Sequence, residues 1–321
     1  MPVLKFMLSV WLLGLLITAG SVSGQTDLPS DAIRSVQWSP SGDAIAVGTE
    51  GDGLTVYDAE TLDVVFEFAD TEHSIENVEW SHNGEMLAAT FDDRIYIWDA
   101  TDFQLLHILS GHVNIISSVS WSPDDSKLAS TNYGGNPLPI EVGMLKIWNI
   151  GTGQETLSKL IPSGSVAWNS ITGELVGFDG LRMVTIDPLT GASQSLCETC
   201  VSDAAYDIRW SPNGNKLVTS TRSYLVVYNS AIDVTVGILT GSVNNYSVSW
   251  SPEGTLIVSG DSTGKVQIWD VETQALVKEF QTDNDEVYAV DWSPDGAWIA
   301  YGGTNGVLGF YDAAISEAIQ P

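Results

Sequence analysis

Two cysteines separated by two residues are the first candidates for chemistry in this chain. Cys197 and Cys200 form a Cys-x-x-Cys motif, and the sequence has no other cysteine. Such a pair can exchange electrons, bind zinc or close a disulfide. Redox activity needs a thioredoxin-like strand-to-helix setting and zinc needs two further ligands, and neither accompanies this motif. In an exported protein the default is a structural disulfide, which we predict between Cys197 and Cys200.

A serine motif and the histidines give no convincing catalytic set. The run from Gly260 to Gly264 matches Gly-x-Ser-x-Gly, but a nucleophile elbow needs a strand-to-helix turn and a histidine base. The four histidines show no catalytic or metal-ligand spacing. The acidic loop with Asp283 and Asp285 lacks the glycine and bidentate glutamate of a calcium loop. We therefore predict no catalytic residue, no metal site and no cofactor.

The net charge limits the classes of partner. The chain has 12 Lys and Arg against 41 Asp and Glu, a formal net charge of -29. A field of this sign repels phosphate backbones and anionic lipid surfaces, so nucleic acid is excluded as a partner. The acidity indicates mainly solubility outside the cell and secondarily a preference for cationic partners or calcium.

The first 24 residues have the pattern of a secretory signal peptide. Lys5 supplies a positive start, Phe6 to Ile17 form an apolar segment, and small residues follow. The apolar run is shorter than the roughly 20 residues that span a bilayer, which favours cleavage after Gly24 over a membrane anchor. We therefore expect a signal peptide at 1–24, one domain at 25–321, no membrane insertion after cleavage, and a periplasmic or secreted location.

Seven repeats organise the rest of the chain. Each has a tryptophan, with Val or Ile two positions before it and Ile or Leu seven positions after it. Five repeats place Ser-Pro directly after the tryptophan, and a glycine usually follows, which is typical of a tight turn between antiparallel strands. The seven tryptophans are Trp38, Trp80, Trp121, Trp168, Trp210, Trp250 and Trp292.

A third strand is predicted to end in an aromatic residue followed by Asp or Asn, and a fourth apolar run comes after it. Trp98-Asp99, Trp269-Asp270 and Gly111-His112 resemble the WD-repeat family, and the resemblance covers residues 31 to 321. Trp292 to Gly296 also resembles periplasmic propellers related to that family. Four strands per repeat and the resemblance both imply an all-β, seven-bladed β-propeller of four-stranded antiparallel blades. We expect Ala318 and Ile319 to supply a short last strand.

The resemblance has one gap. WD repeats commonly join a histidine, a Ser or Thr, a turn Asp and the tryptophan of the Trp-Asp pair in a hydrogen-bond network. Here His112 is the only histidine at that spacing, and Val142 stands at the place of the Asp. We therefore expect no complete network and stability mainly from packing.

One position of the repeat carries the strongest functional signal. Four residues before each core tryptophan lies the start of the innermost strand, which in propellers of this family resembles the binding rim of the top face. This position holds tyrosine in repeats five, six and seven and arginine in the first, so ring closure brings them together. Tyr and Arg most often anchor interfaces. We predict a partner-binding site of Arg34, Tyr206, Tyr246 and Tyr288, with structural packing at the channel mouth as the alternative.

The third repeat has an insertion between its second and third strands, from Asn132 to Met144. Insertions in repeats often decorate the binding face, although a tolerated surface loop is an equal alternative. We add Tyr133 of this segment to the predicted partner-binding residues.

Two functions remain. The first is a monomeric, non-catalytic scaffold outside the cytoplasm that binds protein or peptide partners through the top face. The second is a propeller hydrolase or metal-dependent ligand binder that uses the central channel, with Glu76 and Glu286 as its acids. Because no histidine joins these acids, we prefer the scaffold and predict that the protein is not an enzyme.

Overall fold

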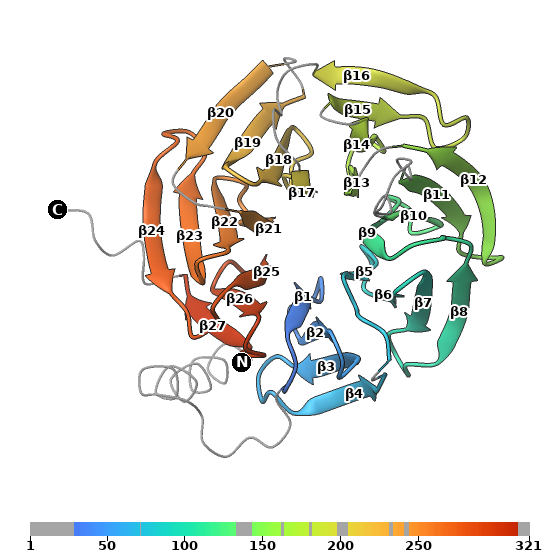
Figure 1. The fold of residues 1–321 in the computed structure, drawn as a ribbon, viewed down its shortest axis with the longest axis horizontal. Helices are drawn as coiled ribbons and strands as arrows, with labels where there is room; N and C mark the ends of the chain where they lie inside the picture. The colour runs from blue at the N-terminus through green and yellow to red at the C-terminus, as the bar shows by residue number, and fades with distance from the viewer. Residues whose placement is uncertain are drawn as a thin grey trace, which may run out of the picture.

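The computed structural model describes residues 29–70, 72–132, 143–161, 164–179, 182–197, 205–230, 234–240 and 244–313. The described residues form seven antiparallel sheets and no helix. Figure 1 shows the sheets arranged as blades around a central axis. The predicted all-β, seven-bladed propeller is therefore confirmed.

Each blade runs outward from an innermost strand beside the axis. The innermost strands are β1 (Ile33–Trp38), β5 (Val78–Trp80), β9 (Ile116–Trp121), β13 (Val166–Trp168), β17 (Ala205–Trp210), β21 (Asn245–Trp250) and β25 (Val287–Trp292). The second strands are β2 (Ala44–Thr49), β6 (Met86–Phe91), β10 (Lys127–Asn132), β14 (Leu175–Asp179), β18 (Lys216–Thr221), β22 (Leu256–Asp261) and β26 (Trp298–Gly303).

The outer half of each blade follows in chain order. The third strands are β3 (Leu54–Asp58), β7 (Arg94–Asp99), β11 (Met144–Asn149), β15 (Arg182–Ile186), β19 (Tyr224–Asn229), β23 (Lys265–Asp270) and β27 (Gly309–Asp312). The outermost strands are β4 (Val64–Phe68), β8 (Leu105–Ser110), β12 (Gln154–Leu160), β16 (Ser193–Cys197), β20 (Val234–Thr240) and β24 (Leu276–Gln281). In the described residues blade seven has three strands, and the predicted last strand at Ala318 and Ile319 lies outside them.

The hydrophobic core lies between the blades. Each of the seven clusters combines side chains of two neighbouring blades. Trp80, for example, packs with Leu54 and Val56 of blade one and Leu87 of its own blade. A single two-faced sheet cannot bury both of its apolar faces, so the blades are stable only against one another.

The core tryptophans also bond the blades together. The indole N–H of Trp80 donates to the Gln37 carbonyl of the preceding blade over 3.3 Å, and that of Trp121 donates to the Glu79 carbonyl over 3.0 Å. Trp210 and Trp250 repeat the pattern at their own joints. At these four joints the tryptophan contributes both its ring and its single donor, whereas the indole N–H groups of Trp168 and Trp292 donate to carbonyls of their own turns.

The prediction about the His112 network was wrong in one respect. His112 Nε2 lies 2.7 Å from Ser130 Oγ, which accepts a 2.8 Å bond from the Trp148 indole. His112 Nδ1 lies 3.2 Å from Oδ1 of Asn132. Asn132 therefore takes the role of the turn Asp, which the repeat spacing had placed at position 142. An amide oxygen can accept in place of a carboxylate. Val142 itself lies outside the described residues.

Candidate partner-binding site at the channel mouth

A repeated β-bulge positions the candidate site. In blade one Ile33 pairs with Thr49 and Ser35 pairs with Gly48, which leaves Arg34 as the extra residue of its strand. An extra residue disrupts the strict alternation of side chains and redirects one of them. Both Arg34 and Ser35 consequently line the central cavity. The bulged residues of the five blades that share this feature are Arg34, Ser117, Tyr206, Tyr246 and Tyr288.

The bulged residues of blades five, six, seven and one form a continuous cluster, which we call the tyrosine rim: Tyr206, Tyr246, Tyr288 and Arg34. The Tyr206 and Tyr246 ring centroids are 5.6 Å apart and those of Tyr246 and Tyr288 are 5.1 Å apart, both edge to face. The Arg34 guanidinium carbon lies 4.2 Å from the Tyr288 ring centroid. The structure thus brings four of the predicted site residues together, and all four are half-buried.

Carboxylates surround the tyrosine rim. Arg34 forms an ion pair with Glu50 and is close to Glu76. Burial alone would lower the pKa of Arg34, but these carboxylates outweigh it and the net shift is upward. Burial and a hydrogen bond to Glu286 raise the pKa of Tyr246 to about 12. The pKa of Tyr288 is also raised, mainly by burial, so both of these tyrosines are neutral phenols at physiological pH.

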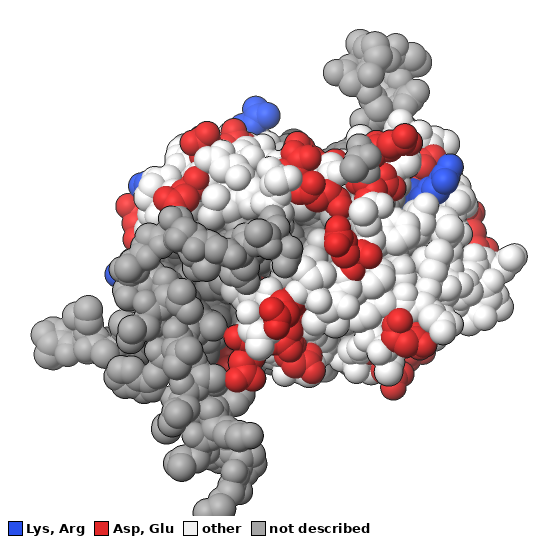
Figure 2. Space-filling view, turned by 90° about the horizontal axis from the view of Figure 1, so that it is seen from below, with Lys and Arg blue, Asp and Glu red and all other residues white. Residues whose placement is uncertain are grey.

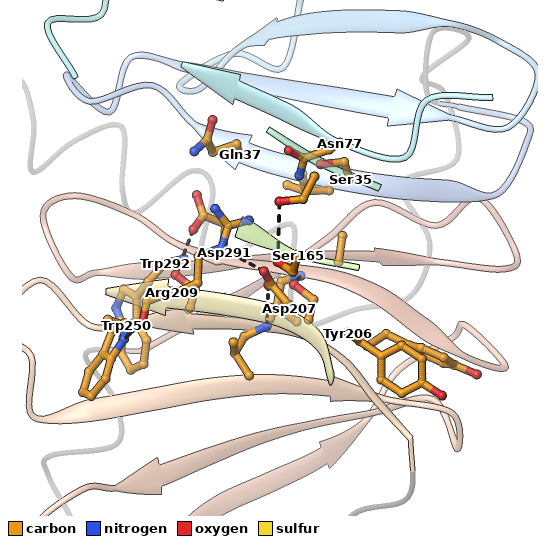
Figure 3. Close-up of a pocket in the computed structure, with 18 of the residues that line it drawn as sticks. Ser35, Gln37, Asn77, Ser165, Tyr206, Asp207, Arg209, Trp250, Asp291 and Trp292 are labelled. Carbon is orange, nitrogen blue, oxygen red and sulfur yellow. Dashed lines mark hydrogen bonds and ion pairs between the residues drawn. The ribbon is translucent and has the colours of Figure 1, made fainter. Parts of the chain in front are cut away.

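The rim is the mouth of the central channel, a cavity of about 490 Å³. In Figure 3 Tyr206 lies at one end of this cavity and Trp250 at the other, with Asp207 between them. Figure 2 shows acidic side chains spread over one side of the molecule and few basic ones among them.

Below the rim, polar side chains of one blade bind backbone amides of the next. Ser35 Oγ accepts from Val78 N over 3.0 Å, and Gln37 Oε1 accepts from Trp80 N over 2.6 Å. The free edge of an innermost strand would otherwise leave these amides unpaired. Further acceptors at the same two repeat positions are Asn77, Ser118, Ser120, Asp207, Ser247, Ser249 and Asp291. We call this set the channel belt.

Charged side chains also meet in the channel. Arg209 Nε lies 3.3 Å from Asp207 Oδ1 and interacts with Glu79 and Asp291. Burial raises the pKa of Glu79 to about 8 and that of Asp291 to about 6. Of the described residues, no three His, Cys, Asp or Glu side chains form a group that could hold a metal ion.

Three predicted features fall partly or wholly outside the described residues. Tyr133 and the signal segment at 1–24 lie outside them. Cys197 ends β16 and is disulfide-bonded, whereas Cys200 lies outside the described residues, so their pairing stays a prediction. In the described part of the chain, no helix is long and apolar enough to cross a membrane.

Sequence reasoning missed the channel belt, and it named Glu286 only as a channel acid and not as a partner of Tyr246. The belt had a signal, because the positions one and three residues before the core tryptophan are polar in most repeats. The contact of Glu286 with Tyr246 had no signal in the sequence, since it depends on how a loop approaches the rim.

Comparison with known proteins agrees with this architecture. Residues 64–99 and 103–136 match the family described as WD domain, G-beta repeat. The chain is a seven-bladed propeller with WD repeats. Residues 188–308 of the propeller also match the family described as eukaryotic translation initiation factor eIF2A.

Several plant proteins are similar to the propeller. The B-type cell cycle switch protein ccs52B of Medicago truncatula is 27% identical over 269 residues, which cover 78% of this chain and 53% of that protein. Protein FIZZY-RELATED 3 of Arabidopsis thaliana is 25% identical, over 76% of this chain and 51% of that protein. Autophagy-related protein 16 of Arabidopsis thaliana is 26% identical, over 61% and 38%. The propeller thus spans about half the length of the first two relatives.

Proposed function

We propose that this propeller is a non-catalytic scaffold that binds a basic segment of a protein or peptide partner at the tyrosine rim. The observation that carries the proposal is a continuous row of three half-buried tyrosines at the mouth of a cavity, in which each ring contacts the next and the last ring, Tyr288, contacts Arg34. Tyrosine supplies a large, rigid contact area together with a polar hydroxyl, the combination that interface anchors use.

Charge supports a cationic partner. Glu50, Glu76 and Glu286 lie around the rim, and Arg34 is close to the first two. The whole chain adds a formal net charge of -29. A negative field of this kind raises the rate at which a basic segment meets the rim, and it does so most strongly at low salt.

Two further observations support binding over catalysis. Belt residues of the channel wall, such as Ser35 and Gln37, are already engaged by backbone amides and so serve to hold blades together. The relatives named above are cell-cycle and autophagy proteins, and their names denote no catalytic activity.

We extend the proposal to a monomer, because the described blades form a closed ring with β1 beside β25 (Figure 1).

We also propose that the protein works outside the cytoplasm, in a periplasm or after secretion. The signal-like pattern of residues 1–24 supports this, and so does the disulfide at Cys197, because disulfides persist in oxidising compartments. Amino-terminal sequencing of the protein purified from its natural compartment tests the location. A first residue after position 24 agrees with export, and an intact Met1 in the cytoplasm contradicts it.

The binding proposal is tested with a displayed library of random peptides. The wild type is compared with the double variant Tyr246→Ala, Tyr288→Ala and with the control Leu189→Ala, which truncates a 74% exposed side chain away from the rim. We expect the wild type and the control to select the same peptides, rich in Lys and Arg, and the double variant to lose them. Equal selection by the double variant, with unchanged melting temperature, would remove the rim as the site.

A further inference from the structure

Arg34 occupies a surface that suits a cation from outside. Its guanidinium carbon is 4.2 Å from the Tyr288 ring centroid, the geometry of a cation–π contact. The next tyrosine of the rim, Tyr246, meets Tyr288 edge to face at 5.1 Å and continues the same aromatic surface. A basic side chain of a partner would therefore meet the same kind of surface that Arg34 already covers at one end.

The polar interactions that position Arg34 are weak or incomplete. The Arg34–Glu50 ion pair lies at the surface, with 28% of the Arg34 side chain and 40% of the Glu50 side chain exposed. Exposed pairs of this kind contribute little to stability. The Nε atom of Arg34 is buried and has no hydrogen-bond partner among the described residues. A guanidinium with one unsatisfied N–H is not locked in place by its surroundings.

The rest of the rim favours one more positive charge. Glu286 accepts hydrogen bonds from Tyr246 and Tyr288, so its carboxyl group lies close to both rings. Tyr206 extends the surface 5.6 Å beyond Tyr246, on the side away from Arg34. The charge of Arg34 at the end of this surface opposes a second cation.

We propose that Arg34 is a built-in competitor that covers part of the tyrosine rim and lowers its affinity for the basic side chain of a partner. This inference rests on the proposed function, but it reverses the role expected of Arg34 from the sequence. If Arg34 were an anchor, it would bind a carboxylate of the partner, and removing its charge would weaken binding. If it is a competitor, removing its charge strengthens binding of a basic ligand.

The sign of that change is measured by titration calorimetry on the full mature chain. The probes are an acetylated, amidated peptide of alternating arginine and glycine and its glutamate–glycine counterpart. Arg34→Gln is compared with Arg94→Gln, which removes the same charge from a 53% exposed side chain on β7. We expect Arg34→Gln to bind the basic peptide about three- to tenfold more tightly than the wild type, and Arg94→Gln to stay within about twofold.

Two rim variants separate the failure of this inference from the failure of the proposed function. Tyr246→Leu should lose the basic peptide, whereas Tyr246→Phe, which keeps the ring, should retain most of the affinity. If Tyr246→Leu loses binding but Arg34→Gln also weakens it, the rim is the site and the competitor role is wrong. If the wild type binds the glutamate peptide and Arg34→Gln loses it, Arg34 is an anion anchor. If the folded Tyr246→Leu variant binds the basic peptide as tightly as the wild type, both proposals are wrong.

Discussion

Asp125 of blade three binds His82 of blade two across the joint between their turns. Asp125 Oδ1 accepts from the His82 backbone N–H and lies 2.9 Å from His82 Nδ1. At five other joints a turn glycine of one blade packs against a turn proline of the preceding blade, as Gly84 does against Pro40. In this one joint Asp replaces the glycine and His replaces the proline. Asp125 keeps the left-handed backbone of the glycine, with φ of 54°.

This exchange predicts a strong coupling between the two positions. Asp125→Gly relieves the positive φ but removes the acceptor of the His82 and Asn83 amides, and His82→Pro removes a donor to a buried carboxylate. We expect each single variant to lower the free energy of unfolding by about 1–3 kcal/mol. The double variant should recover most of the loss, because it recreates the proline–glycine contact of the other joints.

A double-mutant cycle by urea denaturation measures this coupling. The turn itself is compatible with proline, since Gly84 N donates to Ser81 O over 2.9 Å as Gly42 N does to Ser39 O. Additive losses in the double variant would show that the two residues act independently.

Glu79 predicts an unusual dependence of stability on pH. Burial raises its pKa from 4.5 to about 8 in the folded protein. A group with a raised folded pKa stabilises the fold below its unfolded pKa, and this contribution is lost as the pH rises toward the folded value. The free energy of unfolding should therefore fall between about pH 5 and pH 8, by about 1–4 kcal/mol from this group.

The variant Glu79→Gln isolates that contribution. Glu79 accepts a hydrogen bond from the Trp121 backbone N–H. Gln37 stands at the same repeat position in blade one and accepts from Trp80 N over 2.6 Å, so a glutamine at position 79 can accept the Trp121 bond in the same way. We expect Glu79→Gln to be more stable than the wild type at pH 8 and to flatten the pH profile. Glu60→Gln, at an exposed turn position, is the control. Parallel profiles for wild type and Glu79→Gln would contradict the prediction.

The core of the fold was predictable from the sequence because it depends on repetition. Trp80 and its counterparts end the innermost strands as the spacing indicated, since each blade solves the same burial problem with the same residues. The neighbourhood of Arg34 and Tyr288 was predictable for a topological reason, because closing the ring joins the first repeat to the last.

The details of the site depend on features that spacing does not encode. The bulge that turns Arg34 toward the channel arises from the pairing register of β1 with β2. Asn132 enters the His112 network from the end of β10, where it is the first residue of the insertion. The ion pair of Arg34 with Glu50 joins a strand to a turn and depends on side-chain geometry.

Gly302 predicts a steric limit at the joint where the ring closes. A Cβ atom at this position would lie 2.4 Å from Cγ2 and 2.8 Å from Cβ of Ile33, which is fully buried in blade one. The contact is with a β-branched side chain that has no room to move, so Gly302→Ala should lower the free energy of unfolding by about 1–3 kcal/mol. Gly151→Ala, where the nearest atom is 3.6 Å away, should change it little. Equal melting temperatures for the two variants would show that the closing joint yields without cost.

The channel belt predicts that one joint can be strengthened. Ser120 Oγ accepts from Trp168 N over 2.9 Å, and Ser249 Oγ accepts from Trp292 N over 3.3 Å. At the joint between blades four and five the same repeat position holds Ala167, which has no side-chain acceptor for the Trp210 amide. Ser120→Ala should therefore lower the free energy of unfolding by about 1 kcal/mol, and Ala167→Ser should raise it by up to about that amount.

Hydrogen exchange distinguishes this belt effect from a general change in packing. In the wild type the Trp210 amide should exchange faster than the Trp168 amide, because Ser120 protects only the latter. Ala167→Ser should slow exchange at Trp210 and leave Trp168 unchanged, and Ser120→Ala should do the reverse at Trp168. If Ala167→Ser slows neither amide, the serine hydroxyl does not reach the backbone of the next blade. The spacing of the blades, and not the missing hydroxyl, would then prevent the belt hydrogen bond at that joint.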